Sequence, residues 1–291
     1  MTFKVAIIGT GNIGTDLLIK LLRTDNFQII GFIGRRPSTK SLPLNVKYFD
    51  TGIDFFIQNP MCCDLVFECT DAYSAAIHAP IFLKQGIIVI DMTPSKIGRM
   101  CVPNINCKYL DNIKNINMIT CGGQVSIPLI KYISSKCIIS YVEVVTQISS
   151  ESAGMATRIN IDKYIETTEN AIKTLVNVPL CKVILNVNPC KTTIMQTTLF
   201  CKCSKGDFKD FENFIQEIKI YIPHYNISSY PVYTNGILMV SVTVLGSGDY
   251  ISKYSGNLDV INCAAIEVAK KINQIKTIYK KSNDYENILD I

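Results

Sequence analysis

Cys121 has the setting that most favours covalent chemistry in this sequence. It ends an apolar, strand-like run from Ile116 to Thr120 and precedes Gly122 and Gly123, with a helical stretch expected at Ser126–Ser135. Amide groups at a helix N-terminus lower the pKa of a thiol and stabilise an oxyanion. We therefore predict that Cys121 is a nucleophile that needs little else to form a thiolate. The alternative is a small buried apolar residue, which is the usual role of a free cysteine.

The remaining cysteines and histidines limit the other chemistry. Only two histidines, His78 and His224, occur, so we expect the nucleophile to work without a histidine partner, and we interpret both as structural. The twelve cysteines lack CxxC pairs, and no second ligand cluster stands near Cys62-Cys63 or Cys201-Lys202-Cys203. We expect reduced core cysteines and no metal site.

A glycine-rich turn near the N-terminus indicates a dinucleotide site. Gly9-Thr10-Gly11-Asn12-Ile13-Gly14 follows the strand-like run Lys4–Ile8 and precedes a helical stretch, Asp16–Leu22. In such a fingerprint Gly9 permits a tight turn, Gly11 lets the pyrophosphate approach the backbone, and Gly14 lets the helix sit close to its strand. The helix N-terminus then faces the phosphates, and a coincidental glycine turn is the alternative.

Two arginines follow the second strand of this unit, where a domain specific for NAD usually has an acidic residue. Arg35 and Arg36 stand there, directly after Gly34. Guanidinium groups suit a 2′-phosphate, so we predict that the site takes NAD or NADP, that NADP is at least tolerated, and that this pair favours it. A solvated arginine pair in a loop is the competing interpretation.

The elements expected to position these residues predict an α/β fold. Strands at 28–33, 64–68 and 86–91 with a helix at 74–85 complete a Rossmann dinucleotide-binding domain. After Cys121, strands at 141–149, 183–186, 194–201 and 236–245 and helices at 157–176 and 208–221 predict a second, α+β domain. An amphipathic terminal helix from Leu258 returns to the first. We place the domains at 1–120 plus 256–291 and at 121–255.

Composition agrees with a compact cytoplasmic enzyme. The 291 residues are 48% apolar and 18% charged, enough for two cores. The net charge of +5 is modest and the lysines are scattered, which argues against nucleic acid or acidic membranes as partners. No apolar run approaches the length of a membrane span, and the first residues lack a signal-peptide pattern.

Several motifs together resemble the acylating acetaldehyde dehydrogenase family of aromatic-degradation pathways, nearly end to end. The resemblance is carried by Lys4–Leu17, Asp91–Pro94 with Ile97-Gly98, Thr120–Gln124 with Ile127-Pro128, Ser152–Gly154, Thr157-Arg158, Asn160–Asp162, Asn188-Pro189 and Gly256–Asp259. A joint match of this kind is far more specific than any one motif.

The resemblance implies an oxidoreductase that converts a short aliphatic aldehyde, first of all acetaldehyde, and coenzyme A to acyl-CoA while NAD(P) is reduced. It implies that Cys121 carries the acyl group as a thioester. It also implies a homodimer formed through the second domain and a 4-hydroxy-2-oxovalerate aldolase as partner. The residues that it places around the dinucleotide are Thr10, Gly11, Asn12, Ile13, Ser152, Ala153, Gly154, Met155, Ala156, Thr157, Arg158, Ile159, Asn160 and Asn257.

Three departures from the family pattern keep two alternatives open. Met155-Ala156 replaces Pro-Gly, Thr197 replaces an aspartate thought to assist the active site, and the stretch 231–246 is shorter than in relatives. One alternative is an acyl-CoA or semialdehyde reductase of a specialised pathway. The other is a weakened NAD(P)-binding subunit that stabilises an aldolase.

Overall fold

A parallel sheet forms the first half of the molecule. The computed structural model describes residues 2–36, 43, 45–110, 112–154, 157–158 and 161–289, with side chains as far as residue 278. Seven strands pair in the order β3-β2-β1-β4-β5-β7-β6, all in parallel. They are β1 (Phe3–Ile8), β2 (Phe27–Ile33), β3 (Tyr48–Phe49), β4 (Leu65–Glu68), β5 (Ile88–Asp91), β6 (Arg99–Met100) and β7 (Asn115–Asn117).

Helices cover both faces of this sheet, which explains why β4 and β5 are buried along their length and are apolar up to their last residues, Glu68 and Asp91. On one face Leu17 and Leu21 pack with Ile261 and Ala265. On the other face the ring of Phe82 lies in a separate core. The helices are α1 (Asn12–Leu22), α2 (Asp54–Gln58), α3 (Ala72–Lys84), α4 (Pro103–Asn106), the 3-10 turn η1 (Cys107–Tyr109) and α9 (Gly256–Leu289).

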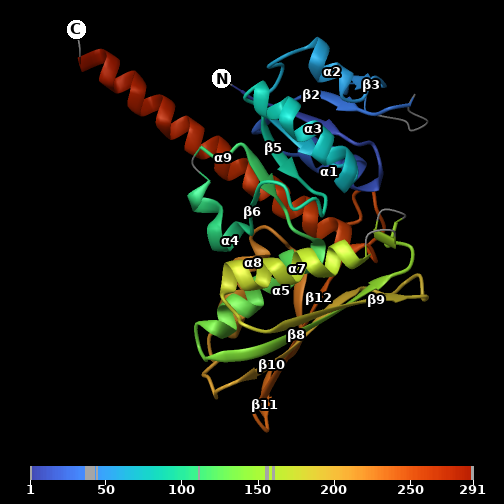
Figure 1. The fold of residues 1–291 in the computed structure, drawn as a ribbon, viewed down its shortest axis with the longest axis vertical. Helices are drawn as coiled ribbons and strands as arrows, with labels where there is room; N and C mark the ends of the chain where they lie inside the picture. Colours follow the sequence, from blue (N-terminus) through green and yellow to red (C-terminus); the bar gives the residue numbers. More distant parts are fainter. Residues whose placement is uncertain are drawn as a thin grey trace.

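A second sheet forms the other half, with helices on one face (Figure 1). Its order is β11-β12-β10-β8-β9, with β8 and β9 parallel and the other pairs antiparallel. The strands are β8 (Ile139–Ser149), β9 (Cys181–Asn188), β10 (Met195–Cys203), β11 (Tyr225–Thr234) and β12 (Ile237–Val244). The helices that lie on it are α5 (Cys121–Ser134), α7 (Ile161–Val176) and α8 (Phe211–Lys219).

The predicted fold class is confirmed, because a Rossmann-like parallel sheet and a second α+β unit are both present. The boundaries around Cys121 were wrong. Strand β7 ends at Asn117 instead of Thr120, and helix α5 begins at Cys121 itself instead of near Ser126. Strand β11 was not predicted at all. Within the described part of the chain, no helix is both long and apolar enough to cross a membrane.

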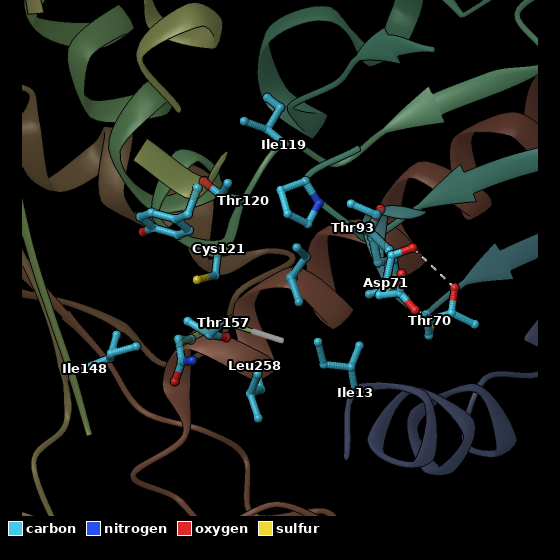
Figure 2. A pocket seen from close by; sticks show the side chains of 17 residues that line it. Ile13, Thr70, Asp71, Thr93, Ile119, Thr120, Cys121, Ile148, Thr157 and Leu258 are labelled. Carbon is cyan, nitrogen blue, oxygen red and sulfur yellow. Dashed lines mark hydrogen bonds between the residues drawn. The ribbon is translucent and has the colours of Figure 1, made fainter. Parts of the chain in front are cut away.

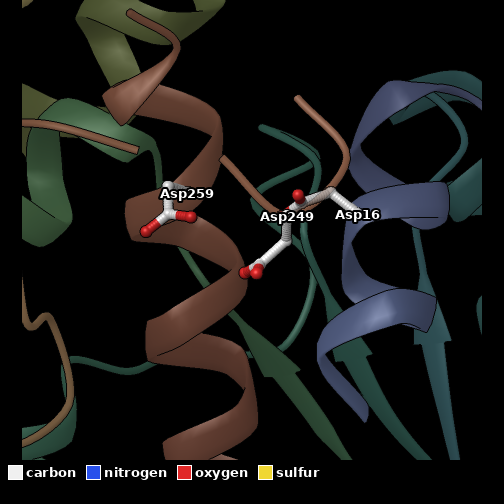
Figure 3. A group of neighbouring side chains, drawn as sticks. All are labelled: Asp16, Asp249 and Asp259. Carbon is white, nitrogen blue, oxygen red and sulfur yellow. The ribbon is translucent and has the colours of Figure 1, made fainter. Parts of the chain in front are cut away.

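A buried charge network holds α9 to α1 and to the loop after β12. Figure 3 shows the three carboxylates of this network, from Asp16, Asp249 and Asp259. The Lys20 ammonium lies 2.5 Å from Asp249, 2.6 Å from Asp259 and 3.6 Å from Asp16. Burial opposes its charge, but the bonds to Asp249 and Asp259 raise the pKa of Lys20 above its usual value. The ammonium therefore fills the place that a cation would take among these acids.

Candidate active site

A mostly apolar cavity of about 100 Å³ lies where the carboxyl ends of the parallel strands meet the N-terminus of α5. Figure 2 shows the Cys121 sulfur pointing into it, with Thr157 and Leu258 nearby. Ligands of open parallel sheets bind at this edge, where the strand order reverses between β1 and β4. The lining residues are Ile13, Cys69, Thr70, Asp71, Ala72, Met92, Thr93, Pro94, Ile119, Thr120, Cys121, Ile148, Thr157, Tyr164, Asn257, Leu258 and Ile261.

A strained turn positions the cysteine. Ile119 has a φ of 65°, a conformation that costs a β-branched residue roughly 1–3 kcal/mol. Its amide donates to Asn117 Oδ1 at 2.9 Å, which holds the turn. Thr120 then caps α5, because its Oγ1 accepts from the Gly123 amide at 2.9 Å and lies 2.7 Å from Thr168 Oγ1. Cys121 is thereby fixed as the first residue of the helix.

The protonation of Cys121 differs from the prediction. Burial raises the pKa of its thiol to about 11, and the Gly122 amide and the Tyr164 hydroxyl lower it only in part. The expectation that helix amides alone give a thiolate is therefore wrong for the protein without ligands. The next two amides of the helix are already used, since Gly123 donates to Thr120 Oγ1 and Gln124 donates to the Thr120 carbonyl.

The glycine turn has the geometry that a dinucleotide needs. Gly9 has a φ of +104°, and a Cβ there would lie 2.5 Å from the Cys69 carbonyl. A Cβ on Gly14 would lie 1.9 Å from the Gly9 oxygen, so only glycine allows this close packing. A Cβ on Gly11 would meet nothing within 4 Å, which leaves open space in front of the first amides of α1. The three positions thus fit a bound pyrophosphate.

The rest of the predicted turn lies beside the cavity. Ile13 lines it, whereas Thr10 is half-buried and Asn12 is exposed at the first position of α1. A Cβ on Gly34 would lie 2.9 Å from Thr10 Oγ1, so Thr10 packs against the end of β2. The turn therefore reaches the cavity through the Ile13 side chain, while Thr10 packs against β2 and Asn12 is exposed.

The segment predicted from Ser152 to Asn160 reaches the cavity through one described side chain, that of Thr157. Arg158 instead donates to the carbonyls of Ala153 and Ser150, both at 2.9 Å, and so braces its own loop. Ser152 and Ala153 are buried and Gly154 is exposed, none of them in the lining. Met155, Ala156, Ile159 and Asn160 lie outside the described residues.

Asn257, in the first turn of α9, is the predicted residue that presents a free polar atom. Its Nδ2 donates to the Ser152 carbonyl at 3.4 Å. Its Oδ1 is buried without a hydrogen-bond partner among the described residues, although the side chain lines the cavity. A buried carbonyl oxygen without a partner is costly, so this atom fits a ligand donor such as an amide.

Arg35 and Arg36 are both exposed at the end of β2, outside the cavity lining. Arg35 packs beside Gly52, whose Cβ would lie 3.1 Å from Arg35 Cγ. Its charge also reaches Asp71 on the rim of the cavity. Burial opposes ionisation of Asp71, but hydrogen bonds from Ser74 and Tyr73 and the charge of Arg35 lower the pKa of its carboxyl.

Thr197, a departure from the family pattern, and His78, interpreted as structural, both make local contacts. Thr197, at the position of the expected aspartate, is fully buried outside the cavity lining and bonds to Thr146 Oγ1 at 3.1 Å. His78 lies 2.7 Å from Glu68 Oε2 in the first unit. Both side chains are thus engaged in the core.

Sequence reasoning did not assign several cavity residues to the site. Thr70 and Thr93 follow the ends of β4 and β5, and the rule that parallel sheets bind ligands at their carboxyl edge would have found them. Ile148, Tyr164 and Leu258 come from β8, α7 and α9, and no local pattern marks them. Their place depends on how the two units meet.

Comparison with known proteins follows the same division of the chain. Residues 4–110 match the family model "Semialdehyde dehydrogenase, NAD binding domain", and residues 121–252 match "Prokaryotic acetaldehyde dehydrogenase, dimerisation". The acetaldehyde dehydrogenase of Spirochaeta aurantia is 44% identical over 92% of this chain and 94% of its own. That of Pectobacterium atrosepticum is 40% identical over 94% and 96%, and that of Geobacillus stearothermophilus is 36% identical over 94% and 97%.

Solved structures share the fold at low identity. Aspartate semialdehyde dehydrogenase II of Vibrio cholerae, complexed with ASA, has a TM-score of 0.68 at 16% identity and covers 94% of this chain and 99% of its own. A probable aspartate-semialdehyde dehydrogenase of Pseudomonas aeruginosa has a TM-score of 0.69 at 11% identity over 96% and 100%. The resemblance inferred from the motifs is confirmed by the sequence matches.

Proposed function

The chain belongs to the acetaldehyde dehydrogenase family, and from this premise we propose that it oxidises a short aliphatic aldehyde to an acyl thioester on Cys121 and passes the acyl group to coenzyme A. Acetaldehyde is the first substrate to test. One observation carries the proposal. The Cys121 sulfur opens into a cavity that is also lined by Ile13 of the glycine turn and by Asn257.

The chemistry follows from the sulfur and its surroundings. The Cys121 thiolate attacks the aldehyde carbon, and the carbonyl oxygen takes up a proton to give a thiohemiacetal. A bound nicotinamide supplies the acceptor for the hydride whose loss, with that of the hydroxyl proton, leaves a thioester. The thiol of coenzyme A then attacks the thioester carbon and releases Cys121. Apolar lining residues such as Ile148 and Leu258 keep water from this thioester.

The residues that would hold the dinucleotide are the glycine turn and Asn257. The open space at Gly11 and the first amides of α1 suit the phosphates, and the unpartnered Asn257 Oδ1 suits an amide donor. The matching family model describes an NAD-binding domain. Coenzyme A enters the proposal as a co-substrate through family membership.

Turnover by the purified protein tests the proposal. Acetaldehyde, propanal and longer aldehydes are each mixed with NAD or NADP, with and without coenzyme A, and the absorbance of the reduced cofactor is followed. We expect turnover that depends on coenzyme A and falls at least about a thousandfold in Cys121→Ser, because the nucleophile is lost. The control Cys190→Ser, at an exposed cysteine, should keep full activity. Turnover that survives in Cys121→Ser contradicts the proposal, and cofactor binding without turnover favours the weakened-subunit alternative.

Acceptance of NADP is the finer part of the cofactor assignment. Arg35 and Arg36 are exposed at the end of β2, within electrostatic reach of the cavity rim at Asp71. The ratio of kcat/KM for NADP to that for NAD should fall about tenfold or more in Arg36→Asp, since a carboxylate repels the 2′-phosphate. Lys84→Asp, an equal charge change at the far end of α3, is the control. An unchanged ratio in Arg36→Asp removes the arginine argument.

Assembly through the second sheet is the quaternary structure that we propose. Residues 121–252 match a dimerisation model, and the face of the sheet opposite α5, α7 and α8 carries half-exposed apolar side chains such as Phe200. Phe200→Glu should yield monomers in size-exclusion chromatography with light scattering, because a charge would be buried in the interface. Ile220→Glu, an exposed apolar site at the end of α8, should not. An unchanged mass of Phe200→Glu argues against this face.

The aldolase partner stays a prediction.

A further inference from the structure

Tyr164 is a buried tyrosine of the cavity wall whose hydroxyl lacks a hydrogen-bond partner among the described residues. Its side chain lies on α7, 6% exposed, 43 residues after Cys121 in sequence. The hydroxyl makes no well-oriented hydrogen bond to any described residue. A buried hydroxyl in this state costs stability unless another state of the protein supplies a partner. The hydroxyl is therefore available to donate to an acceptor that enters or forms in the cavity.

The position of this hydroxyl identifies the acceptor. A Cβ built on Gly122 would lie 1.9 Å from Tyr164 Oη and 3.4 Å from Thr146 Oγ1. The hydroxyl thus occupies the space beside the first turn of α5, next to the nucleophile, and Gly122 has to be glycine to leave room for it. The Cys121 sulfur and the Tyr164 hydroxyl are near enough for each to alter the pKa of the other.

The described side chains that line the cavity place no positive charge beside the Cys121 sulfur. None of the described residues that line the cavity is lysine, arginine or histidine. The other titratable side chains of the lining are Cys69, after β4, and Asp71, which caps α3, and neither contributes to the pKa of Cys121. Two helix amides are also engaged, by Thr120. The sulfur therefore depends on the Gly122 amide and on neutral donors.

Resting on the proposed function, we propose that Tyr164 is a catalytic residue whose hydroxyl donates a hydrogen bond to the Cys121 sulfur once that sulfur is ionised. Tyr164 suits this role because burial raises the pKa of its phenol well above the usual value, which keeps the proton on the donor.

The test compares Tyr164→Phe with the wild type by alkylation of Cys121. Iodoacetamide labelling is followed from roughly pH 6 to 11, and the peptide that contains Cys121 is resolved by mass spectrometry so that the other cysteines do not contribute. Loss of a hydrogen bond to a charged group should lower the equilibrium fraction of that charged form about tenfold or more. We expect labelling of Tyr164→Phe about tenfold slower on the rising limb, and a pH profile of kcat/KM displaced upward by about one unit.

Two further variants make the result decisive. Tyr225→Phe removes another buried tyrosine hydroxyl that is bonded to α5, at 2.9 Å from the Val125 carbonyl, and should leave both profiles unchanged. Gly122→Ala forces the Tyr164 hydroxyl away and should reproduce the shift of Tyr164→Phe, even if the latter folds poorly.

Coincident labelling and kcat/KM profiles for wild type, Tyr164→Phe and Gly122→Ala overturn the proposal. This outcome is distinct from failure of the proposed function, which would appear as turnover that survives in Cys121→Ser. The labelling comparison does not depend on turnover, so it still decides whether the tyrosine bonds to the sulfur.

Discussion

The Cys121 sulfur is held among apolar side chains, and its protonation controls what it can do. Burial raises the pKa of the thiol to about 11, against the lowering influence of the Gly122 amide and the Tyr164 hydroxyl. The thiolate is the reactive form, so the protein without ligands keeps its nucleophile mostly protonated near neutral pH. Such a thiol resists oxidation. It becomes reactive when a bound cofactor or substrate changes its surroundings and lowers its pKa.

This protonation gives a pH dependence that can be measured site by site. In the protein without ligands, alkylation of Cys121 should accelerate about tenfold per pH unit and show no plateau below about pH 10, because the thiolate fraction keeps rising until the pKa is passed. Exposed Cys190 is an internal reference in the same digest. Hydrogen bonds from Thr192 lower the pKa of its thiol, so its labelling should level off at lower pH. A plateau for Cys121 near pH 8 would contradict this account.

Helix α5 shows where local sequence rules end. Two glycines disfavour a helix, which is why its start was expected near Ser126. The helix nevertheless begins at Cys121, because Thr120 caps it. A Cβ on Gly122 would lie 1.9 Å from the Tyr164 side chain, and a Cβ on Gly123 would lie 2.9 Å from that of Ile119. Tertiary packing thus selects glycine and outweighs the cost in propensity.

The cap of α5 can be tested on its own. Thr120→Val keeps the shape of the side chain but removes the acceptor of the Gly123 amide and the bond to Thr168, so the free energy of unfolding should fall by about 1–2 kcal/mol. Thr167→Val is a matched control, since the Thr167 hydroxyl is buried without a partner among the described residues and its loss should not destabilise the protein. Urea denaturation measures both. Equal stability of the two variants would show that the cap contributes nothing.

Strand β11 was missed for an equally physical reason. It contains Pro231 and several polar residues, which argues against a strand in the middle of a sheet. It lies at the edge of the second sheet, where a proline is tolerated because one side of the strand has no partner. The parallel strands around the glycine turn were predicted within a few residues, because burial on both faces makes each a mostly apolar run.

At the scale of the whole molecule, the site exists because two units meet. The cavity takes residues from α1, α5, α7, β8 and α9, and α9 contributes Val260 to one core and Ile261 to the other. In Figure 1, the start of α9 lies at the junction of the two sheets and its far end projects beyond the first. Local motifs predicted site roles for Cys121 and the glycine turn, and the family resemblance predicted one for Asn257. Neither predicted the residues that this junction brings to them. The predicted domain boundaries stay a prediction.

The network around Lys20 should be essential to this junction. Lys20→Met leaves the carboxylates of Asp16, Asp249 and Asp259 without their cation, so the protein should lose roughly 3–5 kcal/mol of unfolding free energy at neutral pH. The repelling carboxylates then have raised pKa values in the folded state, so the loss should shrink as the pH is lowered and they take up protons.

The control for this network is Arg23→Met. Arg23 is 62% exposed and bonds to Asp249 alone, so its replacement should cost little. Thermal unfolding at two pH values measures both variants. A loss for Lys20→Met that is as small as that for Arg23→Met would mean that the network does not hold α9 in place.

Trapping the acyl group on the enzyme tests the central claim most directly. The protein is mixed with acetaldehyde and oxidised cofactor in the absence of coenzyme A, quenched with acid and digested for mass spectrometry. We predict one acetyl group per chain on the peptide that contains Cys121, formed with one equivalent of reduced cofactor and removed when coenzyme A is added before the quench. Reduced cofactor without an acetyl group on Cys121, or with the acetyl group on another cysteine, would contradict the account.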